Sequence, residues 1–314
     1  MQYYFAPLEG ITDSIFRSLH SKYFPGVDRY FTPFLSPTVH RGLTAREARE
    51  IPRADTLTYE AVPQLLTKVS EDFLWLANVC KDLGYTEVNL NTGCPSGTVT
   101  AKGKGSGMLR DLQSLERFLD NIFEKSPLPI SIKTRIGFYD KDEFPAILEL
   151  YNRYPIKELT IHPRIRADFY KGAVDMDAFR YAMEHSKNPL CYNGDLISFK
   201  KVQAFEKAFP RIEAVMIGRG LVGDPGMLMT GGTDIAALEA FYDELFAVYT
   251  DVFGGTRNAM FRLKENWRHL LCKFEDSEKL GKRLRKTTDA GEYKAITREI
   301  FRTLPLREEM QPDW

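Results

Sequence analysis

Residues 70–91 read SEDFLWLANVCKDLGYTEVNLN, a helical segment followed by a short β-rich run. Ser70 is typical of a helix N-cap, and the apolar residues after it recur at helical spacing, which predicts an amphipathic helix over 70–83. Residues 87–91 then have the composition of a buried strand. A helix that leads directly into a strand is the repeating unit of proteins with a parallel sheet.

The same alternation extends over the first three quarters of the chain. Eight β-rich runs lie at residues 2–7, 29–32, 59–65, 87–91, 129–135, 158–162, 189–193 and 214–217. Helical segments of suitable length lie between most of them, at 12–21, 70–83, 111–125, 141–154, 175–185 and 198–209. Eight parallel strands within about 220 residues fit a (β/α)8 TIM barrel better than an open sheet. The expected fold class is therefore α/β.

The strand pattern stops near residue 233. Four helical segments follow, at 235–253, 258–274, 277–286 and 291–303. We therefore expect a barrel domain over 1–232 and a smaller all-helical C-terminal domain over 233–314. Two domains also agree with the length of 314 residues, because a single core rarely grows beyond ~250–300 residues.

Composition excludes several classes of protein. The hydrophobic fraction of 43% and the charged fraction of 27% are those of a folded globular chain. No window approaches the ~20 apolar residues of a membrane span, and the first residues lack the features of a signal peptide. We therefore expect a cytoplasmic protein with no membrane partner. We also expect a monomer, although the sequence leaves the oligomeric state open. The four cysteines are widely spaced, which predicts neither a metal site nor a disulfide framework.

Polar residues gather where the expected strands end. Barrel enzymes place their chemistry on the loops that follow the carboxyl ends of the strands. The residues at or near those ends include Glu9, Gln64, Asn91, Cys94, Lys133, His162, Arg164, Asn193, Asp195 and Arg219. Amide, thiol, ammonium, imidazole, carboxylate and guanidinium groups at one mouth predict an active site there.

Two of these positions favour an anionic or electron-rich ligand. Lys133 lies in an apolar strand, on the same face as Ser131 and Arg135, and a buried lysine needs a partner. A cofactor would supply one, and a salt bridge inside the barrel is the alternative. The Gly-Arg-Gly turn at 218–220 follows the last strand, where such barrels often bind phosphate. A tight turn with a surface arginine is the alternative there.

Cys94 stands apart from the other cysteines, which read as small buried hydrophobes. It follows a strand and opens a glycine-rich segment, 93–107, that we expect to be a mobile loop serving as an active-site lid. The nearby Lys102 and Lys104 could lower the thiol pKa or attract an anion. A thiol in this position can act as a nucleophile or as a proton donor. His162, also at a strand end, is either a cofactor contact or a hydrogen-bonded structural residue.

Taken in order, these motifs resemble those of the tRNA-dihydrouridine synthase family. The resemblance rests on APLEGITD (6–13), NLNTGCPS (89–96), KTRIG (133–137), HPR (162–164), NGD (193–195) and MIGRG (216–220). It covers the barrel from residue 2 to about residue 225. Leu8 stands where the family usually has methionine, and Pro163 stands where it usually has the glycine of His-Gly-Arg.

The resemblance implies an FMN-dependent enzyme that reduces specific uridines in tRNA to 5,6-dihydrouridine, with NADPH re-reducing the flavin. Hydride would pass from reduced flavin to C6 of uracil, and Cys94 would protonate C5. Asn91 and Arg164 would contact the target base, which must leave its stack to react. The residues implied to bind FMN are Pro7, Leu8, Glu9, Gln64, Lys133, His162, Asn193, Gly194, Asp195, Gly218 and Arg219.

The distribution of charge along the chain indicates where a nucleic acid could bind. Lys and Arg number 43 and Asp and Glu number 43, so the chain is formally neutral. Residues 254–307, however, hold 14 basic against 7 acidic side chains. Within them, 279–286 carries five positive charges, and we expect Lys282, Arg283 and Lys286 to contact the tRNA backbone. A solvated helix face is the alternative reading of this charge run.

Two other functions remain open from the sequence. One is a flavin-dependent TIM-barrel oxidoreductase that acts on a free pyrimidine or another small molecule. The other is a non-catalytic RNA-binding relative, which has no need of Cys94 or Lys133. A basic helical domain favours the tRNA enzyme over the first alternative, because a small substrate does not need it.

Overall fold

The computed structural model describes residues 1–38 and 40–312. The chain forms two compact units, and each is described by itself. Unit 1 comprises Met1–Pro7, Arg29–Gly194 and Phe209–Met216. Unit 2 comprises Leu8–Asp28, Asp195–Ala208 and Ile217–Trp314.

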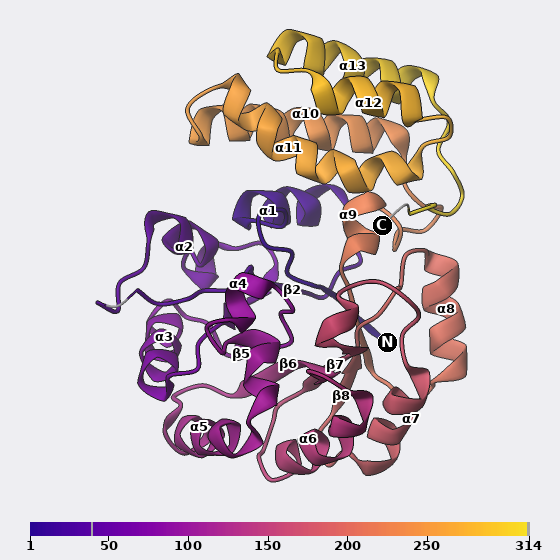
Figure 1. Ribbon diagram of the computed structural model, residues 1–314. Helices are drawn as coiled ribbons and strands as arrows, with labels where there is room; N and C mark the ends of the chain where they lie inside the picture. The colour runs from indigo at the N-terminus through magenta and orange to yellow at the C-terminus, as the bar shows by residue number, and fades with distance from the viewer. Residues whose placement is uncertain (39, 313–314) are drawn as a thin grey trace. The chain divides into compact units, whose positions relative to one another are not determined.

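A parallel sheet forms the centre of the barrel (Figure 1). Its strand order is β3-β2-β1-β9-β8-β7-β6-β5-β4. The strands are β1 (Gln2–Phe5), β2 (Arg29–Phe31), β3 (Glu60–Val62), β4 (Gln64–Leu65), β5 (Val88–Thr92), β6 (Ile130–Gly137), β7 (Leu159–Ile165), β8 (Leu190–Tyr192) and β9 (Ala214–Ile217). Each expected β-rich run overlaps at least one of them.

The sheet has nine strands rather than eight because the run at 59–65 is interrupted at Pro63. Proline has no N–H to donate to a neighbouring strand, so pairing breaks there. β3 pairs with β2 and β4 pairs with β5, so the two ends of the strand order are joined by a single residue. The sheet therefore nearly closes on itself, and the predicted TIM barrel is confirmed.

The helices of unit 1 follow the strands along the chain (Figure 1). They are α2 (Ala45–Glu50), α3 (Ser70–Asp82), α4 (Gly97–Thr100), α5 (Leu112–Lys125), α6 (Phe144–Tyr151) and α7 (Met176–His185). In α5, Asp111 accepts a capping bond from the Ser114 N–H at 3.0 Å. One apolar face of α5, including Leu119 and Ile122, is fully buried, so the amphipathic pattern of the sequence becomes a helix packed on the barrel.

Ser70 is not the N-cap of α3, so that expectation is wrong. It is the first helical residue, Val69 occupies the cap position, and no side chain caps the helix. The chain enters α3 through the Thr67 hydroxyl, which accepts the Val69 N–H at 3.1 Å. Acidic Glu71 and Asp72 in the first turn interact favourably with the helix dipole in place of a cap.

The segment 93–107, which we expect to be a mobile loop serving as a lid, is partly helical. It contains α4 and a 3₁₀ helix, η2 (Gly105–Arg110). The Ser106 N–H and hydroxyl both donate to the Cys94 carbonyl, at 3.1 and 2.8 Å. A Cβ on Gly105 would lie 2.9 Å from that same carbonyl oxygen. Glycine therefore permits a close return of the chain to Cys94, which residue type alone does not reveal.

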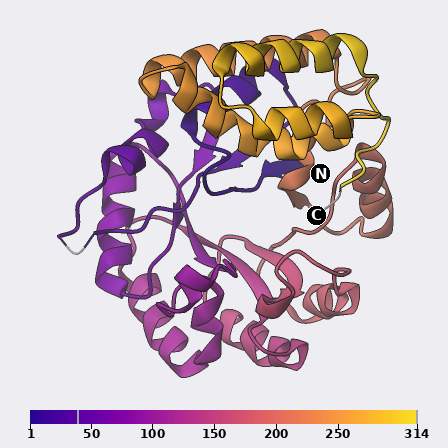
Figure 2. The same ribbon diagram turned by 45° about the horizontal axis from the view of Figure 1, so that its top comes forward.

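Unit 2 contains the four expected C-terminal helices (Figure 2). They are α10 (Ile235–Val252), α11 (Thr256–Leu270), α12 (Glu278–Lys286) and α13 (Ala290–Thr303), and the unit also includes α1 (Ser14–Tyr23), α8 (Phe199–Ala208) and α9 (Arg219–Gly223). Their aromatic core includes Trp267, whose indole N–H donates to the Tyr293 hydroxyl at 2.8 Å. Within the described residues, no helix has the length and apolar character needed to cross a membrane.

α1 packs on α10 within this unit. The rings of Phe16 and Phe241 meet edge to face with centroids 5.4 Å apart. Asp13 caps α1 by accepting the Phe16 N–H at 2.9 Å. The same carboxylate accepts the Tyr249 hydroxyl at 2.9 Å and forms an ion pair with Arg262 at 3.3 Å. An early segment of the chain is thus joined to the C-terminal helices by one buried acid.

Candidate active site

A series of side-chain hydrogen bonds crosses the inner face of β4, β5 and β6. The Gln64 amide donates to Asn89 Oδ1 at 2.8 Å, and the Asn89 amide donates to Ser131 Oγ at 2.9 Å. These residues are paired in register, so their side chains point to the same side of the sheet. All are buried. Gln64, an expected flavin contact, therefore lies in a fixed polar layer inside the barrel.

Lys133 lies in the adjacent layer, in register with Asn91 on one side and Thr160 on the other. Burial lowers the pKa of its ammonium to about 8, and the charge of Arg135 lowers it further, whereas Cys191 and Cys94 act in the opposite direction. No hydrogen bond or ion pair joins this ammonium to another residue of the described ranges. The salt-bridge alternative is thus absent there, and the cation fits an electron-rich ligand.

Asn91 sets the position of Cys94. Its side-chain oxygen accepts the backbone N–H of Gly93 at 3.0 Å and that of Cys94 at 2.9 Å. Its amide nitrogen donates to Gln64 Oε1 at 2.7 Å. The chain therefore turns sharply after β5 and presents a partly exposed Cys94 at the carboxyl end of the strand.

Arg135 joins three backbone segments around Cys94. Its guanidinium donates to the carbonyls of Gly93 at 2.9 Å, Ile165 at 2.8 Å and Phe169 at 2.5 Å. Burial lowers its pKa to about 10. The family-like motif contains Arg135 but does not reveal this structural role, although its alternation with Lys133 predicts that both face inward.

Arg164 and His162 form a second polar pair on β7. Arg164 Nη1 lies 3.0 Å from His162 Nε2, and Arg164 Nε donates to the Lys171 carbonyl at 3.2 Å. The Tyr170 ring stacks on the His162 ring with centroids 6.0 Å apart and an interplanar angle of 27°. No sequence signal identified Tyr170 as part of this site, because it lies beyond the expected strand and its motif.

Lys104 has a hydrogen-bond partner on another segment of unit 1. Its ammonium donates to Ser36 Oγ at 2.8 Å. Burial lowers its pKa, and the charges of Lys102 and Lys68 lower it further. These lysines therefore form a local concentration of positive charge in unit 1, one member of which is held by a hydroxyl.

The remaining expected residues of unit 1 follow β1 and β8. The Asn193 amide donates to the Met216 carbonyl at 2.7 Å. A Cβ on Gly194 would lie 2.8 Å from the Tyr192 hydroxyl and 2.9 Å from Val174 Cγ1. A side chain here would clash with both of these neighbours, so close packing inside unit 1 favours glycine at this position. Pro7 lies two residues after the end of β1 and is partly exposed.

Unit 2 holds the other expected cofactor residues. Arg219 forms an ion pair with Asp195 at 3.1 Å, and Asp195 has a positive φ of 40°. Gly218 is the N-cap of α9, and no side chain caps this helix. The unit also holds Leu8, whose N–H donates to the Thr12 hydroxyl at 2.9 Å, and the exposed Glu9.

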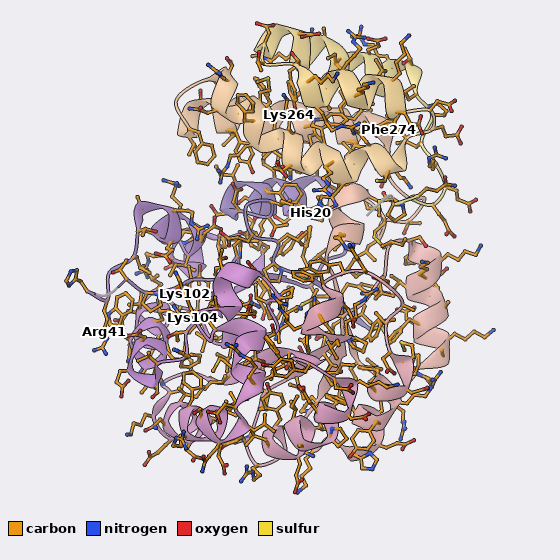
Figure 3. All side chains as sticks on the ribbon, in the orientation of Figure 1. His20, Arg41, Lys102, Lys104, Lys264 and Phe274 are labelled. Carbon is orange, nitrogen blue, oxygen red and sulfur yellow. The ribbon has the colours of Figure 1, made fainter. Side chains whose placement is uncertain are left out.

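The basic residues of α12 lie on one exposed face. Leu280 and Leu284 are buried, whereas Lys282, Arg283 and Lys286 are exposed. Arg283 forms an ion pair with Glu299 of α13 at 3.1 Å. Lys264 of α11 (Figure 3) donates to the carbonyls of Arg285 and Thr287, which fixes the carboxyl end of α12.

Several known proteins are similar to this chain in sequence or in fold. A family model described as dihydrouridine synthase (Dus) matches residues 4–291. A probable tRNA-dihydrouridine synthase of Rickettsia conorii is 27% identical over 229 residues, covering 71% of this chain and 67% of that protein. The tRNA-dihydrouridine synthase B of Proteus vulgaris is 29% identical over 221 residues, covering 70% and 67%.

A structural likeness concerns the fold alone. A mutant of morphinone reductase in complex with tetrahydroNAD has a TM-score of 0.52 and 12% sequence identity, with coverage of 75% of this chain and 89% of that one. The family match defines the class of protein, a flavin-dependent oxidoreductase. More specifically, this chain belongs to the dihydrouridine synthase family.

Proposed function

We propose that this chain reduces specific uridines in tRNA to 5,6-dihydrouridine, with FMN as its flavin and NADPH as the reductant. Membership of the family supports the reduction of uridine, and the names of the relatives support tRNA as the substrate. The observation that carries the proposal is a partly exposed Cys94, held by Asn91 at the carboxyl end of β5. We also propose that the enzyme works in the cytoplasm and that it is a monomer.

The residues of the barrel fit a flavin. Lys133 offers a cation without a hydrogen-bonded partner in the described chain. The residues proposed to hold FMN are Pro7, Leu8, Glu9, Gln64, Lys133, His162, Asn193, Gly194, Asp195, Gly218 and Arg219. Bound FMN, once reduced by NADPH, supplies the hydride for C6 of uracil.

Cys94 then acts as the general acid. Addition of hydride at C6 leaves negative charge that is shared between C5 and the neighbouring carbonyl of uracil. The Cys94 thiol donates its proton to C5 and so completes the reduction. Asn91 holds the backbone of Cys94, and we propose that Asn91 and Arg164 also contact the base.

The proposed tRNA-binding part is the helical domain over 233–314, with the barrel domain over 1–232 carrying the chemistry. Lys282, Arg283 and Lys286 are exposed on α12, where they can contact phosphates. The competing function is reduction of a free pyrimidine or another small molecule in the same barrel, for which these charges have no use.

The test is mass spectrometry of nucleosides from unmodified tRNA transcripts incubated with the FMN-loaded protein and NADPH. We expect dihydrouridine at defined positions. Cys94→Ala should lower the rate by about 10²–10⁴-fold, whereas Cys272→Ala, at a partly exposed cysteine in unit 2, should not. Reduction of free uridine or uracil as fast as tRNA would favour the competing function, and no dihydrouridine in tRNA would refute the proposal.

A further inference from the structure

Three aromatic residues follow the carboxyl ends of two neighbouring strands. Phe138 and Tyr139 come directly after β6, and Phe169 follows the 3₁₀ turn η4 (Arg166–Asp168) at the end of β7. Tyr139 is 68% exposed and Phe169 is 40% exposed. Phe138 is buried, whereas the exposed rings of Tyr139 and Phe169 at the mouth of the barrel indicate a binding surface.

Two arginines are interleaved with these rings. The Arg110 guanidinium carbon lies 4.9 Å from the Phe138 ring centroid. The Arg166 guanidinium carbon lies 5.6 Å from Phe138 and 5.0 Å from Phe169. The Tyr139 and Phe138 rings meet edge to face at 4.7 Å. We call Arg110, Phe138, Tyr139, Arg166 and Phe169 the aromatic–arginine platform.

The positive charges of this platform are not neutralised by a salt bridge. Neither Arg110 nor Arg166 has an ion-pair partner within residues 1–38 and 40–312. The nearby carboxylates bond backbone groups instead. Glu143 accepts the N–H groups of Phe138 at 2.6 Å and Tyr139 at 2.9 Å, and Asp168 accepts the Ile165 N–H at 3.0 Å.

The backbone at Phe169 is held in an unfavourable conformation. Its φ is +52°, a region that bulky residues rarely adopt. The Phe169 carbonyl accepts a bond from Arg135, whose guanidinium also bonds the Gly93 carbonyl, next to Cys94. Strain retained at an exposed ring is typical of functional sites. One arginine therefore ties this ring to the segment that carries the proposed acid.

We propose that the aromatic–arginine platform stacks an unpaired base of the RNA, a neighbour of the uridine being reduced. Every base offers a π-face to an aromatic ring, and guanidinium groups add cation–π attraction and contact to phosphate. Exposed rings combined with unneutralised cations therefore match the chemistry of a single-stranded nucleotide. This inference rests on tRNA being the substrate, because a free pyrimidine carries no neighbouring base.

The experiment compares two fluorescein-labelled hexanucleotide probes, oligouridylate and an abasic oligomer with the same backbone, binding to the FMN-loaded protein. The variants are Tyr139→Ala and Phe169→Gly, alone and combined. Glycine accommodates φ +52°, so Phe169→Gly removes the ring and leaves the backbone unstrained. Phe199→Ala, at a 39% exposed ring on α8, is the matched control.

We expect the double variant to weaken oligouridylate binding at least about fivefold, as loss of base stacking does, with abasic binding unchanged. The control should bind both probes normally. If both probes lost affinity equally, the substitutions would be acting through charge or folding and not through base stacking. If neither probe lost affinity, the platform would have no role in binding. Either result overturns the inference.

Failure of this inference can be told from failure of the proposed function. If wild-type protein forms no dihydrouridine in tRNA, yet the double variant selectively loses oligouridylate binding, the platform stands and the proposed reaction does not. If tRNA is reduced and the variants neither lose base-dependent binding nor raise KM for tRNA, the platform is wrong and the reaction stands. Flavin absorbance confirms equal FMN loading in every variant.

Discussion

The side-chain oxygen of Asn91 accepts the backbone N–H of Cys94 at 2.9 Å, so the last inward-facing amide of β5 determines where the thiol lies. A second bond, from the Gly93 N–H at 3.0 Å, fixes the same turn. The amide nitrogen of Asn91 is meanwhile bonded to Gln64 at 2.7 Å. The position of the proposed acid is thus tied to the polar layer inside the barrel.

Asn91→Ala removes the acceptor of both turn bonds. We expect the rate of tRNA reduction by reduced enzyme to fall about tenfold or more, since losing one well-placed hydrogen bond to a buried group costs ~1–3 kcal/mol. Reduction of bound FMN by NADPH should be unchanged, because that half-reaction does not need Cys94. Stopped-flow absorbance separates the two half-reactions.

Asn78→Ala is the matched control for this substitution. Asn78 is exposed on α3, where its amide donates to the Leu74 carbonyl at 2.8 Å. Its loss should leave both half-reactions unchanged. Normal tRNA reduction by Asn91→Ala would contradict a positioning role for Asn91.

The sequence predicts the barrel well because its signals are local. The residue types that favour helices or strands follow one another along the chain, and all eight expected runs overlap observed strands. Three details were not predicted. They are the break at Pro63, the entry to α3 through Val69, and the return of 105–107 to Cys94. The first two depend on residues close by in the sequence, and the third depends on a hydrogen bond from Ser106 back to Cys94.

The sequence likewise predicts some residues of the candidate site but not the roles of others. Motif order and inward alternation bring Gln64, Asn91 and Lys133 into one region of unit 1. The roles of Arg135 and Phe169 could not be predicted, because one bonds three backbone carbonyls from separate loops and the other depends on a positive φ. Neither property has a signature in residue type.

Lys133 should make the flavin-free protein less stable while favouring flavin binding. Burial lowers its pKa from 10.5 to about 8, so the unfolded chain holds this proton more tightly than the folded chain. Stability should therefore rise as pH increases from about 8 to 10.5, and the full penalty applies below pH 8. Lys133→Met removes the penalty, and we expect it to stabilise the flavin-free protein by about 2 kcal/mol at pH 7.

Urea denaturation of flavin-free Lys133→Met and wild-type protein at pH 7 measures this difference. The same variant should bind FMN at least about tenfold more weakly, because a charged group facing an electron-rich ligand contributes ~1.5–3 kcal/mol. Lys81→Met, at an exposed lysine of α3, should alter neither property. A destabilised Lys133→Met protein with normal FMN affinity would mean that Lys133 is structural.

Glu158 should confer the opposite pH dependence. Burial raises its pKa from 4.5 to about 7, while the bond from the Tyr4 hydroxyl at 3.1 Å lowers it and the charge of Glu87 raises it. The folded chain therefore binds this proton more tightly than the unfolded chain. The contribution of Glu158 to the free energy of unfolding is therefore greatest below pH 4.5, and it falls as the pH rises to about 7.

Glu158→Gln keeps an acceptor for Tyr4 and cannot ionise. We expect it to be more stable than wild type by about 2 kcal/mol at pH 8, with the difference shrinking towards pH 5. Thermal or urea denaturation at both pH values measures this, with Glu71→Gln on the exposed face of α3 as the control. A difference that does not change with pH would contradict the assigned titration.

Reversal of charge on α12 should affect tRNA and not flavin. Lys282, Arg283 and Lys286 are exposed, and the apolar face of the helix is anchored by the buried Leu280 and Leu284. Changing the three basic residues to Glu should therefore leave the helix folded. Loss of three phosphate contacts should weaken tRNA binding and reduce the slope of log Kd against log salt by about 2–3.

Filter binding of tRNA at several salt concentrations measures both quantities, and flavin absorbance checks that FMN is retained. The matched control is the same reversal at Lys200, Lys201 and Lys207, which are exposed on α8 of the same unit. If both triple variants lose affinity and salt slope equally, the effect reflects total charge, because each changes the net charge by the same amount. A selective loss for α12 assigns the phosphate contacts to that helix, since overall electrostatic attraction is matched between the two variants.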